Sequence, residues 1–117
     1  MAEICRNGLA GMAFLLFYVT HPDESTARRI AQQMVEQRLA ACANVFPITS
    51  VYRWQGAVQN EGEWVSVLKT SLEREGDLER ALCAVHPYEV PCLLRYEVRA
   101  NEAYERWIRE STTATPE

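Results

Sequence analysis

The stretch Phe14-Leu15-Leu16-Phe17-Tyr18-Val19 is a continuous apolar run, and the rest of the fold can be built outward from it. A run of this length is typical of a central β-strand whose two faces are both covered. The wider apolar segment from Leu9 to Val19 is too short to cross a membrane, which takes about 20 residues. Arg6 suggests a secretory leader, but Glu3 and the absence of a small-residue cleavage pattern favour a core strand.

The segment after Pro22 has the spacing of an amphipathic helix. Its apolar residues recur at Ala27, Ile30, Ala31, Met34, Val35 and Leu39. Asp23 or Ser25 can accept hydrogen bonds from the free amide groups at the start of this helix. His21, beside Pro22, is predicted to be exposed to solvent.

A hairpin is predicted from the middle of the chain. β-forming residues dominate from Cys42 to Trp54 and again from Trp64 to Leu68. The polar stretch from Gln55 to Gly62 is predicted to connect these two strands. Pro47 lacks an amide hydrogen for a sheet ladder, so we expect a bulge or a sheet edge there.

Three further elements complete the chain. Apolar residues at helical spacing predict a helix over about 73–85, with Ser71 as its candidate cap. The residues of 93–98 favour a last strand, and the aromatic residues of 104–108 indicate a C-terminal helix. The order βαββαβ plus a C-terminal helix predicts an α+β, ferredoxin-like fold, with one antiparallel sheet and helices on one face.

The chain has the size and composition of one globular domain. It has 117 residues, of which 48% are hydrophobic and 24% are charged. Twelve Lys and Arg against 16 Asp and Glu give a net charge of −4, which disfavours nucleic-acid binding. We assign residues 12–110 to the domain and predict flexible tails at 1–11 and 111–117. Met12 is an alternative start.

The four cysteines favour a reducing, cytoplasmic environment. They form no C-x-x-C pair, and they are too sparse for a disulfide scaffold. We predict that Cys42, Cys83 and Cys92 are reduced and partly buried.

Aromatic side chains are frequent in the predicted strands. Tyr52, Trp54, Trp64 and Tyr96, together with Val67, are too many for a solvated sheet face. We therefore expect copies of the chain to associate and to bury that face between subunits.

Several segments match one known family in order and spacing. They are Arg38-Leu39-Ala40-Ala41-Cys42-Ala43-Asn44, Ser50-Val51-Tyr52-Arg53-Trp54-Gln55-Gly56, Leu68-Lys69-Thr70 and His86-Pro87-Tyr88-Glu89-Val90-Pro91. With them, residues 13–109 resemble the CutA family, the trimeric divalent-cation tolerance proteins. The resemblance implies a ferredoxin-like subunit, a homotrimer, a link to copper and other divalent metals, and no settled enzymatic activity.

The segment from His86 to Pro91 carries the candidate metal site. If it is polyproline-like, His86 and Glu89 project to one side, and an imidazole with a carboxylate suits a divalent ion such as copper. If it is a pleated strand, His86 lies beside Tyr88 and Glu89 points away. The alternative role for His86 is a hydrogen bond to the backbone. Cys42 is the third candidate ligand, with a small buried thiol as its alternative role.

The sequence departs from the family at the expected copper ligands. Copper-binding members are thought to use a cysteine at the end of the first strand and two adjacent histidines before the proline. This chain has Val19 and Val85 at the matching positions and keeps only His86. The resemblance therefore predicts weak copper binding with ligands shared between subunits, and no organic cofactor.

Four residues are candidates for a pocket between subunits: Tyr52, Trp54, Lys69 and Tyr88. Packing is the alternative role for Tyr52 and Trp54. For Lys69 the alternative is an ion pair with Glu61, Glu63 or Glu89.

An enzyme is not predicted. Cys42 and His86 are the one thiol–imidazole pairing available, and the chain has no phosphate-binding loop, dinucleotide fingerprint or metalloprotease motif. The alternative to a metal-linked trimer is a PII-like trimeric sensor of a small molecule or nucleotide, because such sensors share this architecture.

Overall fold

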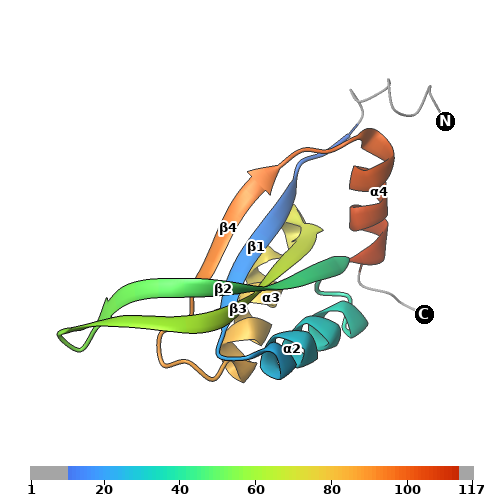
Figure 1. Ribbon diagram of the computed structural model, residues 1–117. Coiled ribbons are helices and arrows are strands. Elements are labelled where there is room, and N and C mark those ends of the chain that lie inside the picture. The colour runs from blue at the N-terminus through green and yellow to red at the C-terminus, as the bar shows by residue number, and fades with distance from the viewer. Residues whose placement is uncertain (1–10, 114–117) are drawn as a thin grey trace.

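The computed structural model describes residues 11–113, so most of the two predicted tails, at 1–10 and 114–117, lies outside the described residues. Its elements are β1 (Phe14–His21), α2 (Glu24–Glu36), β2 (Cys42–Trp54), β3 (Ala57–Ser71), η2 (Leu72–Arg74), α3 (Glu75–Val85), β4 (Leu93–Val98) and α4 (Glu102–Ser111). This is the predicted βαββαβ order followed by a C-terminal helix (Figure 1).

The four strands form one antiparallel sheet in the order β2-β3-β1-β4. In this split arrangement β3 lies between β1 and β2, as the ferredoxin-like plan requires. Phe17 at the centre of β1 pairs with Leu68 of β3 on one side and Arg95 of β4 on the other. Pro47 lies on β2, an edge strand, which confirms the expected sheet edge.

The main core lies between one face of the sheet and the helices α2 and α3. Alternate residues of β1 point into it, because successive side chains of a strand point to opposite faces. The largest side chains of this core are fully buried: Phe17, Ile30, Met34, Leu68, Leu78 and Leu82. Asp23 begins α2 as predicted, since its carboxylate accepts a hydrogen bond from the Thr26 amide at 2.8 Å.

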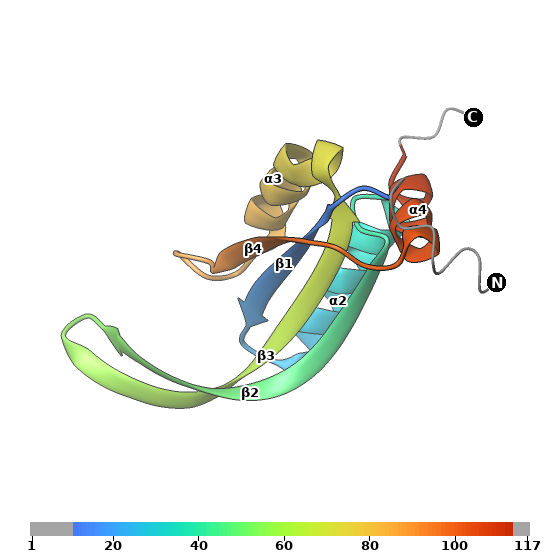
Figure 2. The same ribbon diagram turned by 90° about the horizontal axis from the view of Figure 1, so that it is seen from above.

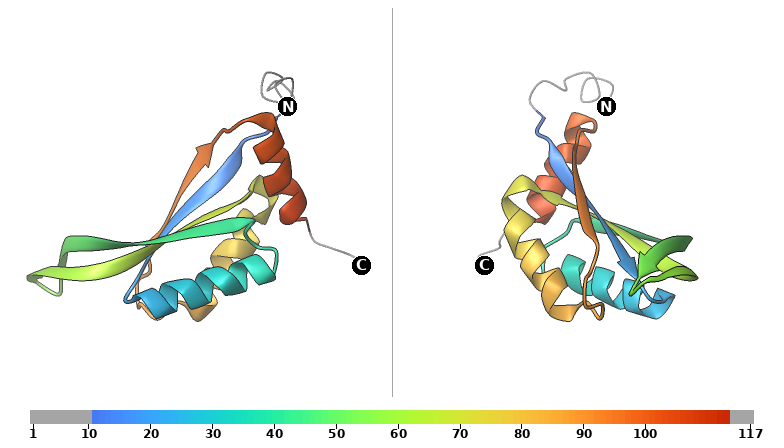
Figure 3. Two further views of the ribbon diagram at one scale, coloured as in Figure 1. Left: turned by 45° about the vertical axis from the view of Figure 1, so that its right-hand side comes forward. Right: turned by 90° about the vertical axis from the view of Figure 1, so that its left-hand side faces the viewer.

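The helix α4 packs on the other face of the sheet, so the prediction of helices on one face holds only for α2 and α3. Phe14 points away from its neighbour Leu15 and contacts Ile108 and Tyr104 of α4. The helices α2 and α3 lie together along the sheet, while α4 lies at the end where β1 and β2 begin (Figure 3). The aromatic residues of 104–108 predicted a helix, but they did not indicate which face of the sheet that helix would cover.

The predicted connection from Gln55 to Gly62 is wrong, because only Gln55 and Gly56 form the turn. Both have positive φ, 50° and 81°, as in the two-residue turns that match strand twist. β2 and β3 stay paired from Cys42↔Lys69 to Trp54↔Ala57. The outer part of this hairpin, residues 50–61, forms a two-stranded ribbon that extends beyond the sheet and curves (Figure 2). Its polar residues face solvent on a strand and do not mark a loop.

Two smaller expectations also need correction. Ser71 makes no capping bond, and its hydroxyl accepts a hydrogen bond from Thr112 at 2.9 Å. Cys83 and Cys92 are exposed, and Cys42 alone is partly buried as predicted.

Candidate functional site

His86 follows α3 and is held by two backbone groups. Its Nε2 donates to the Thr20 carbonyl at 2.7 Å, and its Nδ1 accepts from the Tyr88 amide at 3.1 Å. Pro87 favours the extended conformation of His86, which places the ring back against the end of β1. Both ring nitrogens therefore form hydrogen bonds to the backbone, which is the alternative role that the sequence analysis gave for His86.

His21 lies directly against His86 and is fully buried, so the prediction of an exposed side chain is wrong. Its Nε2 lies 2.8 Å from the Ser66 hydroxyl oxygen, and its ring stacks on that of His86. The pKa of His21 is lowered to about 4, mainly by burial and in smaller part by the neighbouring His86. His21 is thus a neutral imidazole at pH 7.

Two tyrosines on this side of the molecule donate to carboxylates. The Tyr88 hydroxyl donates to Glu63, which is 8% exposed, and the Tyr52 hydroxyl donates to Glu61 at 2.7 Å. Burial, followed by the bond to Glu63, raises the pKa of Tyr88. The bond to Glu61 is the main cause that raises the pKa of Tyr52 to about 12. Both phenols stay protonated and act as hydrogen-bond donors.

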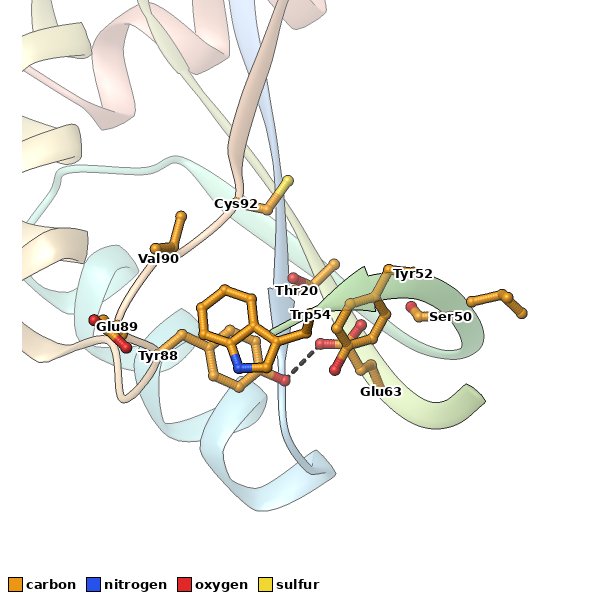
Figure 4. A pocket seen from close by; sticks show the side chains of 10 residues that line it. Thr20, Ser50, Tyr52, Trp54, Glu63, Tyr88, Glu89, Val90 and Cys92 are labelled. Carbon is orange, nitrogen blue, oxygen red and sulfur yellow. Dashed lines mark hydrogen bonds between the residues drawn. The ribbon is translucent and has the colours of Figure 1, made fainter. Parts of the chain in front are cut away.

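These groups border a cleft of 540 Å³ between the ribbon and the segment that follows α3 (Figure 4). It is lined by Thr20, Ser50, Val51, Tyr52, Trp54, Glu63, Tyr88, Glu89, Val90 and Cys92. Three of the four predicted pocket residues, Tyr52, Trp54 and Tyr88, line it, together with Glu89 from the predicted metal site. The volume is within the range of small-molecule sites, roughly 300–1,000 Å³.

Cys42 and Lys69 lie elsewhere, beside Tyr104 of α4. The Cys42 Sγ is 3.5 Å from the Tyr104 hydroxyl oxygen, and the Lys69 ammonium donates to the same oxygen at 3.2 Å. The Lys69 ammonium also lies 5.4 Å from the centre of the Tyr104 ring. Lys69 therefore makes a hydrogen bond and a cation–π contact in place of the predicted ion pair.

The sequence model of the family described as CutA1 divalent ion tolerance protein matches residues 15–111. The chain belongs to this family. The Divalent-cation tolerance protein CutA of Thermotoga maritima is 39% identical over 98 residues, which cover 83% of this chain and 97% of that protein. The protein of the same name from Thermus thermophilus is 42% identical over 96 residues, 80% of this chain and 93% of that protein.

Solved structures of CutA proteins share the fold. The structure of CutA from Synechococcus elongatus PCC7942 superposes with a TM-score of 0.86 at 35% identity, covering 92% of this chain and 98% of that one. A structure described as the periplasmic divalent cation tolerance protein CutA from Archaeoglobus fulgidus gives 0.81 at 32% identity, with 86% and 99% covered.

The three residues predicted to bind metal in this CutA chain do not meet within one subunit. Cys42 opposes Lys69 on β3, whereas Thr20, the partner of His86, opposes Val65. Four residues along β3 separate the two places by about 13 Å. Within residues 11–113 no group of three or more His, Cys, Asp or Glu side chains is arranged to hold a metal ion. A copper centre therefore does not fit the described residues of a single chain.

Sequence reasoning missed His21, Ser66 and Glu63 as site residues. His21 lies two residues after Val19 and four after Phe17, so its side chain points to the same face of β1 as these core residues. This alternation could have predicted its burial.

The helices of residues 11–113 all lack the combination of length and apolar character that crossing a bilayer requires.

Proposed function

We propose that this CutA chain acts as a homotrimer in divalent-cation tolerance and catalyses no reaction. The names of the bacterial relatives described above include divalent-cation tolerance, which supports that part of the proposal. A cytoplasmic location belongs to the same proposal.

The main support for the proposed homotrimer is the exposed apolar surface of the ribbon. Val51 and Val58 are 65% and 64% exposed, and Tyr52 and Trp54 are also exposed. The radius of gyration is 15.9 Å, above the about 13 Å of a compact chain of this length, because the ribbon projects from the body. Packing against other copies would remove these side chains from water.

The assembly can be tested by sedimentation equilibrium. Three copies of the 13.4 kDa chain give a particle of roughly 40 kDa. Val51→Glu places a charge on the ribbon and should shift the protein toward smaller species. Val35→Glu is the control, since Val35 is also an exposed valine but lies on α2, away from the ribbon. A well-folded wild-type monomer at micromolar concentration would refute the proposal.

Any divalent cation would have to be held weakly and between subunits. His86 already uses both ring nitrogens, and Glu89 is exposed with space around it. A site at His86 and Glu89 therefore needs further ligands from another copy and the release of a His86 hydrogen bond. Cys42 could contribute only from another subunit, because its own chain places it too far away.

Calorimetric titration with Cu²⁺ tests this part of the proposal. We expect weak binding that decreases in His86→Ala and in Glu89→Gln. Glu89→Gln preserves size and makes a useful second variant if His86→Ala disturbs the fold. Equal affinity in the wild type and both variants would exclude this site.

The cleft favours a second candidate function, a PII-like sensor of a small molecule. Its volume suits a metabolite, but its lining includes two glutamates and no Lys or Arg. Nucleotide phosphates would find no positive partner among these residues. A thermal shift with ATP and none with divalent metals would favour the nucleotide form of the sensor.

A further inference from the structure

A hollow of 260 Å³ lies between the end of β3 and the last turn of α4. It is lined by Ser71, Glu73, Arg74, Arg109, Thr112 and Thr113. Two arginines from different elements, one from η2 and one from α4, thus border one space. The volume is just below the roughly 300–1,000 Å³ of metabolite sites, which suits a small ligand.

The hollow lies at the opposite end of β3 from the ribbon. Ser71 is the last residue of β3, and ten residues separate it from Glu61, where the ribbon ends, which is about 33 Å along a strand. Accordingly, α4 and the tip of the ribbon lie at opposite sides of the molecule (Figure 1). The hollow therefore uses none of the side chains that the proposed homotrimer draws from the ribbon.

Arg109 brings a positive charge that no carboxylate of the described residues balances. It is half-buried on α4, and the salt bridges of residues 11–113 do not include it. Glu73 also borders the hollow, but it is exposed to solvent, and it forms no salt bridge with either arginine. The Arg109 guanidinium is therefore available to an anion.

Arg74 brings a second guanidinium, which is only partly neutralised. Its side chain is 19% exposed, and its Nη1 donates to Asp77 at 2.9 Å. The same carboxylate also accepts from Arg80, so one negative charge is shared by two positive charges. The Arg74 Nε is buried and has no hydrogen-bond acceptor within residues 11–113. Since a buried N–H group without an acceptor is unfavourable, an acceptor brought to this side chain would be favoured.

The two guanidinium groups select one class of ligand. Each can donate parallel hydrogen bonds to an oxyanion, and together they attract negative charge from different walls of the hollow. A phosphate group carries up to about two negative charges and has oxygens on all sides, so it can bond to both walls at once. A carboxylate has its two oxygens on one edge and suits a single guanidinium. A cation would be repelled by Arg74 and Arg109.

We propose that this hollow binds inorganic phosphate or the phosphate group of a small phosphomonoester, held between Arg74 and Arg109. The proposal goes beyond divalent-cation tolerance, because it concerns an anion and involves none of the candidate metal ligands.

Calorimetric titration of the full chain with sodium phosphate, at an ionic strength held constant with sodium chloride, tests the proposal. We expect saturable binding with a Kd of about 1 mM or tighter, and acetate should bind at least about tenfold more weakly. Glycerol 3-phosphate is the second phosphate probe. Binding at least as tight as that of inorganic phosphate would indicate that the natural ligand is a monoester, and weaker binding would indicate the free ion.

Arg109→Gln should weaken phosphate binding by about tenfold, because it removes the charge that no carboxylate balances. Arg28→Gln is the matched control, since it removes the same charge from an exposed position on α2 and should leave the affinity within about twofold of wild type. Arg109→Lys keeps the charge but loses the planar fork of donors, so its affinity should lie between those of the wild type and Arg109→Gln.

Circular dichroism of every variant distinguishes loss of the site from loss of the fold. The absence of saturable binding up to about 20 mM phosphate would overturn the proposal. So would an unchanged affinity in Arg109→Gln, an equal loss in Arg28→Gln, or acetate binding as tight as that of phosphate. Each of these results stands whatever the sedimentation and the copper titration show.

Discussion

His21 and His86 stack with their ring centres 5.2 Å apart and their planes 23° from parallel. His21 is the last residue of β1, and His86 follows the last residue of α3. The stack therefore joins the end of the central strand to the segment that carries Tyr88. Because His86 also bonds to Thr20, the wall of the cleft is fixed to the core of the sheet.

The first prediction concerns the pH dependence of stability. The pKa of His21 is about 4 in the folded protein, against about 6.5 for an unperturbed histidine. Between these values the unfolded chain binds a proton that the folded chain does not, so the free energy of unfolding falls as the pH is lowered through this window. The expected loss is about 3 kcal/mol per chain, measured by denaturant unfolding near pH 7 and near pH 4.

The His21→Gln variant is the control for this prediction. Glutamine does not titrate and can still reach the Ser66 hydroxyl. The variant should therefore lose less stability than the wild type over the same window. A decline of equal size in both proteins would show that other groups, and not His21, set the acid sensitivity.

The second prediction concerns Ser66, whose hydroxyl is the partner of the His21 Nε2. The Nδ1 of His21 already has no hydrogen-bond partner within residues 11–113. Ser66→Ala would leave a buried imidazole with neither nitrogen bonded, and we expect a loss of about 1–3 kcal/mol in the free energy of unfolding. Ser25→Ala removes an exposed serine hydroxyl instead and should change stability by less than about 0.5 kcal/mol. Similar losses in the two variants would argue against a special role for the buried pair.

The sequence was sufficient to predict the elements whose pattern is local. The apolar run of β1 and the helical spacing after Pro22 each determine one element, and the strand and helix order then leaves few possible topologies. The outer ribbon was mispredicted because a projecting hairpin exposes both faces. Its residues Gln59, Asn60 and Glu61 are polar for that reason, and polarity alone cannot distinguish such a strand from a loop.

The candidate site was predicted in part, and the reason is strand register. Tyr52, Trp54, Tyr88 and Glu89 were expected near one another, and they do line one cleft. Cys42 and Lys69 were expected there too, but the pairing of β2 with β3 places them at the other end of the sheet. The register of a hairpin depends on the position of its turn, and the sequence did not allow that position to be predicted.

The third prediction concerns that turn. Gly56 has a φ of 81°, and an added Cβ would meet nothing within 4 Å. Gly56→Ala should therefore destabilise the protein by about 1 kcal/mol through backbone strain alone. Gln55 also has positive φ, and Gln55→Asn should be neutral or slightly stabilising, because asparagine tolerates this conformation better. Thermal unfolding of both variants measures the difference, and an unchanged midpoint in Gly56→Ala would contradict the assigned turn.

The last prediction concerns the thiols, whose exposure differs along the chain. Cys83 is exposed on α3, whereas Cys42 is partly buried with its sulfur against the Tyr104 hydroxyl. In a short pulse of iodoacetamide, resolved by peptide mass spectrometry, Cys83 should be alkylated at least about tenfold faster than Cys42, since alkylation requires access to the sulfur. Tyr104→Ala should increase the rate at Cys42 and leave Cys83 unchanged, which also shows that the variant remains folded. Equal rates at the two cysteines of the wild-type protein would mean that α4 does not cover this end of the sheet in solution.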